Sequence, residues 1–222
     1  IQIYRSAGGS PLKLDKIGSK SWAKRKAKIK EKALAMAHEL LRKQAQRQQR
    51  KGYTYPASSI LLSQVSSDFP FELTPDQSNA IEDISDSLAS DKATDSLLVG
   101  DVGFGKTEVA IRAIAAVVSE GHQVLFLCPT TVLSLQHHRT LEKRFRPYNI
   151  KVGVLSRLQS TKAARQTKAD FASGKVNILI GTQALLSRDL RAKHIGLVIV
   201  DEEHRFGVKQ KEKIRNFAQR QS

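Results

Sequence analysis

The sequence has little cysteine and no long hydrophobic run, and both shortages exclude classes of protein. Its single cysteine, Cys128, excludes a disulfide framework and favours a reducing compartment. No apolar run is long enough to span a bilayer, and no secretory signal pattern is present. Of the 222 residues, 40% are hydrophobic and 26% charged, so the chain is predicted to form one or two soluble, globular domains.

The first position, Ile1, is not a methionine, and we therefore expect the chain to be a piece of a longer protein. Internal repeats and low-complexity linkers are also absent from the sequence. Cys128 ends an apolar stretch, and a thiol in that place is predicted to be buried and inert.

Basic charge is concentrated near the start of the chain. Residues 11–51 hold fourteen Lys or Arg residues against three acidic residues, and so carry most of the net charge of +16. Such a segment can bind nucleic acid, bind an acidic partner, or form only a solvated helix face.

The basic segment is predicted to be one long helix. Residues 20–51 contain neither glycine nor proline and are rich in strong helix formers, and Gly52 favours a stop. A helix of this length would span about 48 Å. Its apolar residues fall roughly on one face, which is more typical of packing than of a binding site; they are Trp22, Ile29, Ala33, Met36, Ala37, Leu40 and Leu41.

Short apolar strands alternate with helices from about residue 73 onward. Runs of Val, Ile and Leu separated by helices are typical of a parallel sheet that is covered on both faces. Ligands of such α/β sheets bind where the strands end. Strands are predicted at 96–100, 123–129, 152–156, 176–182 and 196–204, and helices at 75–90, 105–120, 132–146 and 160–173.

A glycine-rich turn follows the first of these strands. Gly100, Gly105, Lys106 and Thr107 match the complete phosphate-loop pattern, with a helix predicted to start at the lysine. Lys106 would reach the β- and γ-phosphates, and Thr107 would bind Mg²⁺. The backbone N–H groups of the turn would surround the phosphates, so the predicted nucleotide contacts are Gly100, Asp101, Val102, Gly103, Phe104, Gly105, Lys106 and Thr107.

Two carboxylates directly follow the last apolar strand. Asp201 would hold the Mg²⁺ shell, through water, and Glu202 would polarise the water that attacks the γ-phosphate. A solvated acidic strand end is the simpler interpretation of the pair taken alone. Together with the phosphate loop, the pair predicts a nucleoside triphosphate site with Lys106, Asp201 and Glu202 as its catalytic residues.

The stretch before the phosphate loop suggests which base is bound. Gln77, at a predicted helix start, can bond to the two-sided edge of adenine, and Phe71 or Phe69 can stack on the ring. Thr74 and Pro75 are also ordinary helix-start residues. We expect ATP as the nucleotide. His137 and His138, in contrast, are predicted to be surface residues, because no further ligands at metal spacing accompany them.

Five motifs together carry a family resemblance. They are LTPDQ (73–77), GDVGFGKTEVA (100–110), PTTVLSLQHH (129–138), GTQALL (181–186) and DEEHRFGV (201–208). The set resembles the first motor lobe of superfamily 2 DNA helicases and translocases, and among these most resembles the bacterial transcription-repair coupling factors. Replication-fork-reversal helicases tend to differ at Phe104 and Glu203, and primosome-assembly helicases lack the RFGV that follows the acidic pair.

The resemblance implies a RecA-like three-layer lobe over residues 53–222, preceded by a basic connector helix over 20–52. Residues 1–19 would be the remnant of an upstream module that binds RNA polymerase. The whole protein would be a double-stranded DNA translocase that displaces stalled RNA polymerase in transcription-coupled repair. ATP, Mg²⁺, double-stranded DNA, RNA polymerase and excision-repair proteins would be its cofactors and partners, in the bacterial cytoplasm at the nucleoid.

The resemblance also implies residues that face DNA. Hydroxyl and backbone N–H groups after strand ends suit contacts to phosphates, which carry no sequence information. His204 would couple the nucleotide site to DNA. Without the resemblance, the threonines are explained as helix caps, the Gly-Thr pair as a turn, and Arg157 as a surface residue. The implied DNA contacts are Thr130, Thr131, Arg157, Gly181 and Thr182.

The family pattern is incomplete in this chain. The next family motif, a Thr-Ala-Thr strand end, and the second lobe with its arginine are absent. We therefore expect ATP binding with very slow turnover. Two alternatives remain: the first lobe of a fork-remodelling helicase, and a non-catalytic module in which the basic helix binds nucleic acid.

Overall fold

The computed structural model describes residues 20–48, 52–93, 95–187, 189–207, 210–211 and 213–214. The chain divides into two compact units after Arg50. The prediction of a remnant module at residues 1–19 lies outside the described residues. Among the described residues, no helix is long and apolar enough to cross a membrane.

The first unit contains one long helix, α1 (Lys20–Gln48), which agrees with the helix predicted over 20–51. Its described side chains are exposed, including the apolar face: Ile29 is 68% exposed and Leu41 63%. The packing predicted for that face is therefore not found within the described residues.

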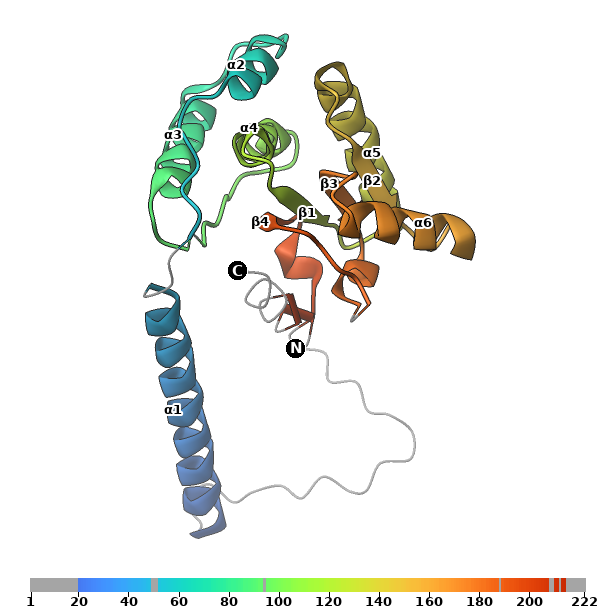
Figure 1. Cartoon of the computed structure of the whole chain (residues 1–222). Helices are drawn as coiled ribbons and strands as arrows, with labels where there is room; N and C mark the ends of the chain where they lie inside the picture. Colours follow the sequence, from blue (N-terminus) through green and yellow to red (C-terminus); the bar gives the residue numbers. More distant parts are fainter. Residues whose placement is uncertain are drawn as a thin grey trace. The chain divides into compact units, whose positions relative to one another are not determined.

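The second unit is a parallel α/β sheet (Figure 1), which confirms the predicted fold class. Its strands lie in the order β2-β3-β1-β4 and all pair in parallel. They are β1 (Gln123–Leu127), β2 (Val152–Leu155), β3 (Ile178–Gly181) and β4 (Ile195–Val200). The α-helices are α2 (Ile60–Ser67), α3 (Pro75–Ala89), α4 (Lys106–Ser119), α5 (Thr131–Phe145) and α6 (Thr161–Ala172). Short 3₁₀ turns occur at η1 (Arg146–Tyr148), η2 (Gln183–Leu186) and η3 (Glu203–Arg205).

Alternate side chains of the central strand β1 enter two separate cores, as the period of a strand requires. Val124 and Phe126 pack with α4, α5 and the ends of α2 and α3, whereas Leu125 and Leu127 pack with Phe171 of α6. Helix α4 lies between the α2–α3 pair and the sheet (Figure 1). All five residues of β1 are buried. The loops that follow the strands therefore begin at backbone positions fixed by the packed sheet.

Side-chain caps fix where most helices begin. Ser59, Thr74, Thr130 and Ser160 each accept a hydrogen bond from the first turn of α2, α3, α5 and α6. Helix α4 differs, because it begins after Gly105 and has no side-chain cap.

The strand predicted over 96–100 is not a strand in the structure, and this prediction is wrong for the chain as it stands. The segment pairs with none of the four strands, and Leu97 and Val99 are 77% and 81% exposed. A strand exists only when its backbone groups bond to a neighbour. The apolar pattern of the segment is typical of a strand, but the segment makes no ladder with a described strand.

Cys128 is buried, as predicted. Burial raises the pKa of its thiol to about 12, and the nearby charge of Asp201 acts in the same direction. The thiol therefore stays protonated near neutral pH and is a poor nucleophile.

Candidate nucleotide site

The four strands end together at one edge of the sheet, which we call the carboxyl edge. Leu155, Gly181, Leu127 and Val200 are register partners across β2, β3, β1 and β4. The residues that follow these strand ends are therefore neighbours. In sheet order they are Ser156 and Arg157, then Thr182, then Cys128 to Thr131, and then Asp201 and Glu202.

The phosphate loop, residues 100–105, leads into α4. Gly103 and Gly105 have φ values of +88° and +72°, a region that is costly for residues with a Cβ. The first N–H groups of α4 lack a side-chain cap and face the loop end. These donors, with the positive end of the helix dipole, form a site suited to phosphate oxygens.

Lys106 folds back over this loop. Its Nζ donates to the backbone oxygens of Gly100, at 2.5 Å, and Asp101, at 2.7 Å. The ammonium group thus lies beside the start of the phosphate loop, where its hydrogen-bond acceptors are neutral backbone carbonyls. A phosphate could replace these acceptors with charged oxygens, which form stronger bonds.

Gln77 joins the start of α3 to the phosphate loop. Its Oε1 accepts from the backbone N–H of Thr74 at 3.0 Å, and its Nε2 donates to the backbone oxygen of Phe104 at 2.9 Å. A Cβ at Gly105 would collide with this amide group, which explains the need for glycine there. The amide still has one hydrogen and one lone pair to offer, enough for the two-sided edge of adenine.

The two candidate aromatic residues differ in exposure. Phe69 packs against Phe71, with ring centroids 5.6 Å apart, and under the guanidinium of Arg144 at 5.5 Å. Phe71 is 73% exposed, so its ring has a free face. Of the two, Phe71 is the one available to stack on a base.

Asp201 is fixed at the carboxyl edge of the sheet. Its backbone N–H donates to the backbone oxygen of Leu127 at 2.9 Å, and its Oδ2 lies 3.0 Å from Nε2 of His137. The hydrogen bond from His137 is the largest influence that lowers the pKa of Asp201, and the charge of Lys106 acts in the same direction. The carboxylate is therefore ionised at neutral pH.

The prediction that His137 is a surface residue is wrong. Its side chain is only 15% exposed, and its ring lies 4.7 Å from that of Phe126 in β1. The contact with Asp201 joins residues 64 positions apart. No spacing in the sequence could predict it, because only the fold brings His137 of α5 to the residue that follows β4. His138, its neighbour, instead contacts the backbone oxygen of Val152.

Glu202 has a left-handed backbone, with φ of +51° and ψ of +49°. This conformation is uncommon for a residue other than glycine and often marks functional sites. Its carboxylate lies 3.3 Å from Nε2 of His204 and 3.8 Å from Nε of Arg205. His204 therefore contacts the residue that the sequence predicts to polarise water.

The residues predicted to face DNA follow the other strand ends. Thr130 caps α5 by accepting from the N–H of Leu133 at 3.3 Å, while Arg157 is exposed after β2. Gly181 is buried where β3 ends, and a Cβ there would crowd Leu155. Thr131 and Thr182 are partly exposed. The carboxyl edge thus brings these residues together with Asp201.

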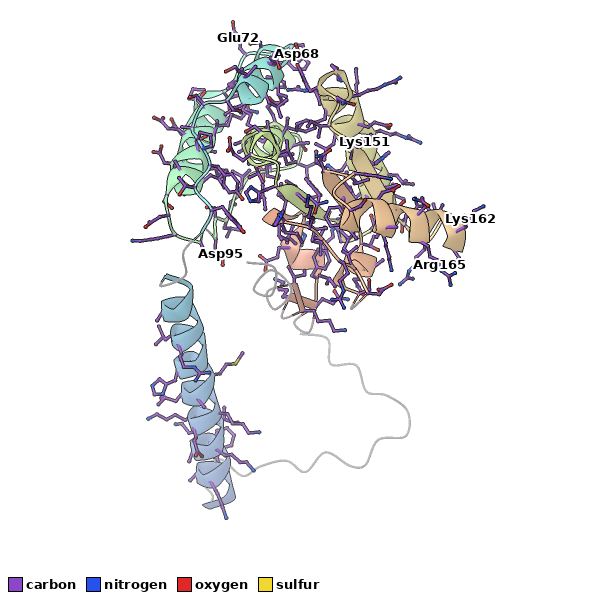
Figure 2. The ribbon with its side chains drawn as sticks, viewed as in Figure 1. Asp68, Glu72, Asp95, Lys151, Lys162 and Arg165 are labelled. Carbon is purple, nitrogen blue, oxygen red and sulfur yellow. The ribbon has the colours of Figure 1, made fainter. Side chains whose placement is uncertain are left out.

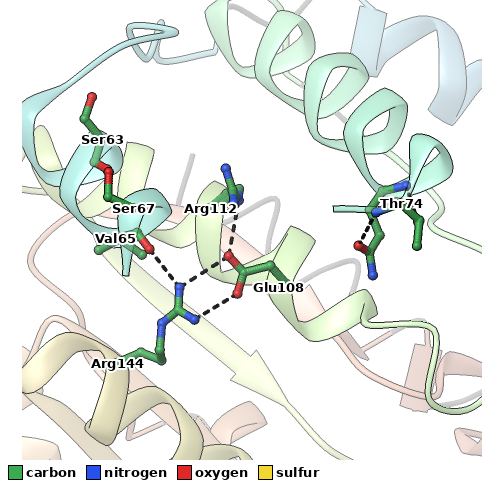
Figure 3. A network of polar contacts seen from close by, with 8 residues as sticks. Ser63, Val65, Ser67, Thr74, Glu108, Arg112 and Arg144 are labelled. Carbon is green, nitrogen blue, oxygen red and sulfur yellow. Dashed lines mark hydrogen bonds and ion pairs between the residues drawn. The ribbon is translucent and has the colours of Figure 1, made fainter. Parts of the chain in front are cut away.

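A buried charge network lies behind the phosphate loop (Figure 3). Glu108, in the first turn of α4, is 4% exposed. Its two carboxylate oxygens contact the two terminal nitrogens of Arg144, Nη1 at 3.2 Å and Nη2 at 3.3 Å. Nε of Arg112 donates to the same carboxylate at 3.2 Å. Arg144 also donates to the backbone oxygen of Val65 at 2.8 Å. The network therefore joins α2, α4 and α5 around the helix that carries Lys106 and Thr107, and sequence reasoning missed it.

The oxygen donors present fit Mg²⁺. Thr107 and Asp201 offer a hydroxyl and an ionised carboxylate, and Mg²⁺ is usually bound by one or two such groups together with phosphates and water. Among the described residues, no group of three His, Cys, Asp or Glu side chains could hold a metal alone. An ion held by Thr107 and Asp201 would take its remaining ligands from phosphates and water.

Comparison with known proteins identifies the family. The model of the DEAD/DEAH box helicase family matches residues 74–222. Transcription-repair-coupling factors of Staphylococcus haemolyticus (strain JCSC1435) and Staphylococcus aureus (strain USA300) are 43% and 42% identical to the chain over 215 residues. This stretch covers 97% of the chain but 18% of each relative, so the chain spans less than a fifth of their length.

Solved structures agree with this assignment. The structure of RecG bound to a three-way DNA junction has a TM-score of 0.69 and 34% identity, and covers 75% of this chain and 23% of that one. The structure of the yeast DEAD-box splicing factor Prp28 has a TM-score of 0.58 and 20% identity. The match covers 73% of this chain and 40% of the Prp28 chain, and it supports the fold alone. These findings confirm the RecA-like fold and the resemblance to transcription-repair coupling factors, and the chain belongs to the DEAD/DEAH box helicase family.

Proposed function

We propose that this chain is the ATP-binding first lobe of a double-stranded DNA translocase. The observation that carries the proposal is the placement of Asp201 at the carboxyl edge, within the electrostatic influence of Lys106 from the phosphate loop. A loop for phosphates and an ionised carboxylate for their metal ion are the two parts that phosphoryl transfer requires.

Each residue of the site has a distinct task in this proposal. The loop N–H groups and Lys106 bind the β- and γ-phosphates, and Thr107 and Asp201 hold Mg²⁺, the latter through water. The metal ion, when bound, neutralises charge on the phosphates. Glu202 polarises the attacking water. His204, which contacts Glu202, couples DNA binding to the position of this carboxylate.

The DNA side of the proposal rests on the other strand ends. Thr130, Thr131, Thr182 and the backbone of Gly181 would bond to DNA phosphates, and Arg157 would add positive charge. RecG, whose solved structure is described as bound to a three-way DNA junction, is 34% identical to this chain. That identity supports DNA as the partner, and it also favours a fork-remodelling helicase as a second candidate.

The name of the relatives, transcription-repair-coupling factor, supports a finer proposal. We propose that the whole protein displaces stalled RNA polymerase and recruits excision-repair proteins in the bacterial cytoplasm, at the nucleoid. Residues 20–52, including α1, would be its connector and 53–222 its first lobe. By itself the chain is expected to hydrolyse ATP very slowly, because an arginine supplied from outside such a site contributes about 10³–10⁵ in rate.

Replacing Gln77 by glutamate tests the choice of base. Glutamate keeps the oxygen that accepts from Thr74, so the start of α3 should survive, but it loses both amide hydrogens, the one that bonds to Phe104 and the one offered to adenine. We expect ATP affinity to fall by about tenfold or more, because a lost hydrogen bond in a built polar site costs about 1–3 kcal/mol. Competition of ATP and GTP against a fluorescent nucleotide measures it.

The matched control is Asp76→Asn, one residue earlier on α3, where the side chain is exposed. It should leave the preference for ATP over GTP unchanged. If Gln77→Glu retains the full preference, adenine is not recognised by this amide group and the assignment of the base fails.

A further inference from the structure

His137 carries an inference that neither the motifs nor the family assignment supplies. It projects from α5 toward β1 and the end of β4, where it contacts Phe126 and Asp201. Its ring is anchored by packing on Phe126, a side chain that is itself 2% exposed. A ring held in this way has little freedom to rotate, so it can impose a direction on the group to which it bonds.

The bond from His137 occupies one oxygen of Asp201. Asp201 is ionised and can only accept, so Nε2 of the ring is the donor across the 3.0 Å contact to Oδ2. The carboxylate side chain is 22% exposed, and its backbone is held by Leu127. The contact with His137 therefore uses Oδ2 and leaves Oδ1 to other partners.

The hydrogen bond from His137 is the largest of the influences on the Asp201 carboxylate. The other influences on it are the backbone N–H of Glu202 and the charge of Lys106, whose Nζ bonds to Gly100 and Asp101 instead. The N–H of Glu202 belongs to the adjoining residue, whereas the imidazole is held by α5 and by Phe126, so the ring is the donor that sets the direction of the carboxylate from another element.

We infer that His137 is a positioning residue for Asp201, which orients the carboxylate toward the magnesium ion of the bound nucleotide. The inference rests on the proposed nucleotide site. Residues that hydrogen-bond to a metal-binding carboxylate fix the direction of that carboxylate. Loss of such a residue typically weakens metal binding by about 10–100-fold. Without the N–H donor, Asp201 would rotate and the site would need more Mg²⁺.

Nucleotide binding at graded Mg²⁺ concentrations tests the inference. A fluorescent ATP analogue is titrated into the whole chain across a Mg²⁺ series and in EDTA. His137→Ala is expected to raise the Mg²⁺ concentration for half-maximal binding by about tenfold or more. Binding in EDTA should stay as in the unchanged chain, because the phosphate loop is untouched.

Three further variants separate orientation from packing. His137→Gln places an amide N–H near the position of Nε2 and should restore most of the Mg²⁺ response. His137→Asn is polar but too short to reach Asp201, so it should raise the Mg²⁺ requirement as alanine does. It therefore tests the inference even where the alanine variant unfolds. His138→Ala, one residue along, removes a ring that contacts Val152 and Glu142, and should change nothing.

Two results would overturn the inference. One is an unchanged Mg²⁺ requirement in both His137→Ala and His137→Asn. The other is an equal loss of binding with Mg²⁺ and in EDTA, which would mean that the ring only supports packing. If the unchanged chain shows no Mg²⁺-dependent binding, the proposed nucleotide site fails first, and the inference falls with it.

Discussion

Glu108→Ala is expected to destabilise the lobe by about 3–5 kcal/mol, the cost of breaking a buried ion pair by removing one partner. The variant leaves the guanidinium of Arg144, whose side chain is 15% exposed, without its carboxylate. Only the backbone oxygen of Val65 and the ring of Phe69 remain as partners for it among the described residues. Arg112 also loses its bond across one turn of α4. Urea unfolding measures the change in free energy.

The control for Glu108→Ala is Glu142→Ala, which removes an acidic side chain that is 55% exposed on α5. Surface changes of this kind stay within about 0.5 kcal/mol. The double variant Glu108→Leu with Arg144→Met should be less destabilised than Glu108→Ala alone, because neither position then holds a buried charge. A cost for Glu108→Ala no greater than that of the control would mean that the network in Figure 3 does not hold the three helices together.

Lys106→Ala is expected to weaken ATP binding by about 10–150-fold. The ammonium group would form charge-assisted hydrogen bonds to phosphate, and a hydrogen bond to a charged group contributes about 1.5–3 kcal/mol. Among the described residues its bonds go to Gly100 and Asp101 within the loop, so thermal stability should hardly change. Isothermal titration with ATP and Mg²⁺ gives the affinity, and a melting curve checks the fold.

Lys151→Ala is the matched control for this charge. Lys151 is exposed (Figure 2) and lies immediately before β2, at the opposite end of the strand from the carboxyl edge. ATP affinity should stay as in the unchanged chain. If both lysine variants lose affinity equally, the attraction is a general effect of positive charge, and Lys106 has no specific role at the phosphates.

The sequence predicts those elements whose pattern is local. Helix α4 is predicted over 105–120 and runs from Lys106 to Ser119, because a glycine turn precedes an apolar helical face. The strands at 123–129 and 196–204 are correct in place but shorter in the structure. The phosphate loop and the acidic pair are equally local, which is why the sequence alone can propose their residues as a nucleotide site.

The predictions fail where a residue depends on distant neighbours. The segment 96–100 has the composition of a strand but pairs with none of the described ones. Helix α2, only eight residues long, has serine-rich ends that are typical of a loop and is held by Val65 in the core. His137 and Arg144 have their roles through Asp201 and Glu108, which lie on other elements. Such long-range contacts produce no recognisable pattern in the sequence, so they cannot be predicted from it.

The most direct measurement of the central claim is a titration of the unchanged chain with ATP and with GTP, each with Mg²⁺. The account predicts that ATP binds, that its binding needs Mg²⁺, and that GTP binds at least about tenfold more weakly, because Gln77 offers adenine one donor and one acceptor. Equal binding of the two nucleotides would contradict the adenine assignment. The absence of binding by either would contradict the nucleotide site itself.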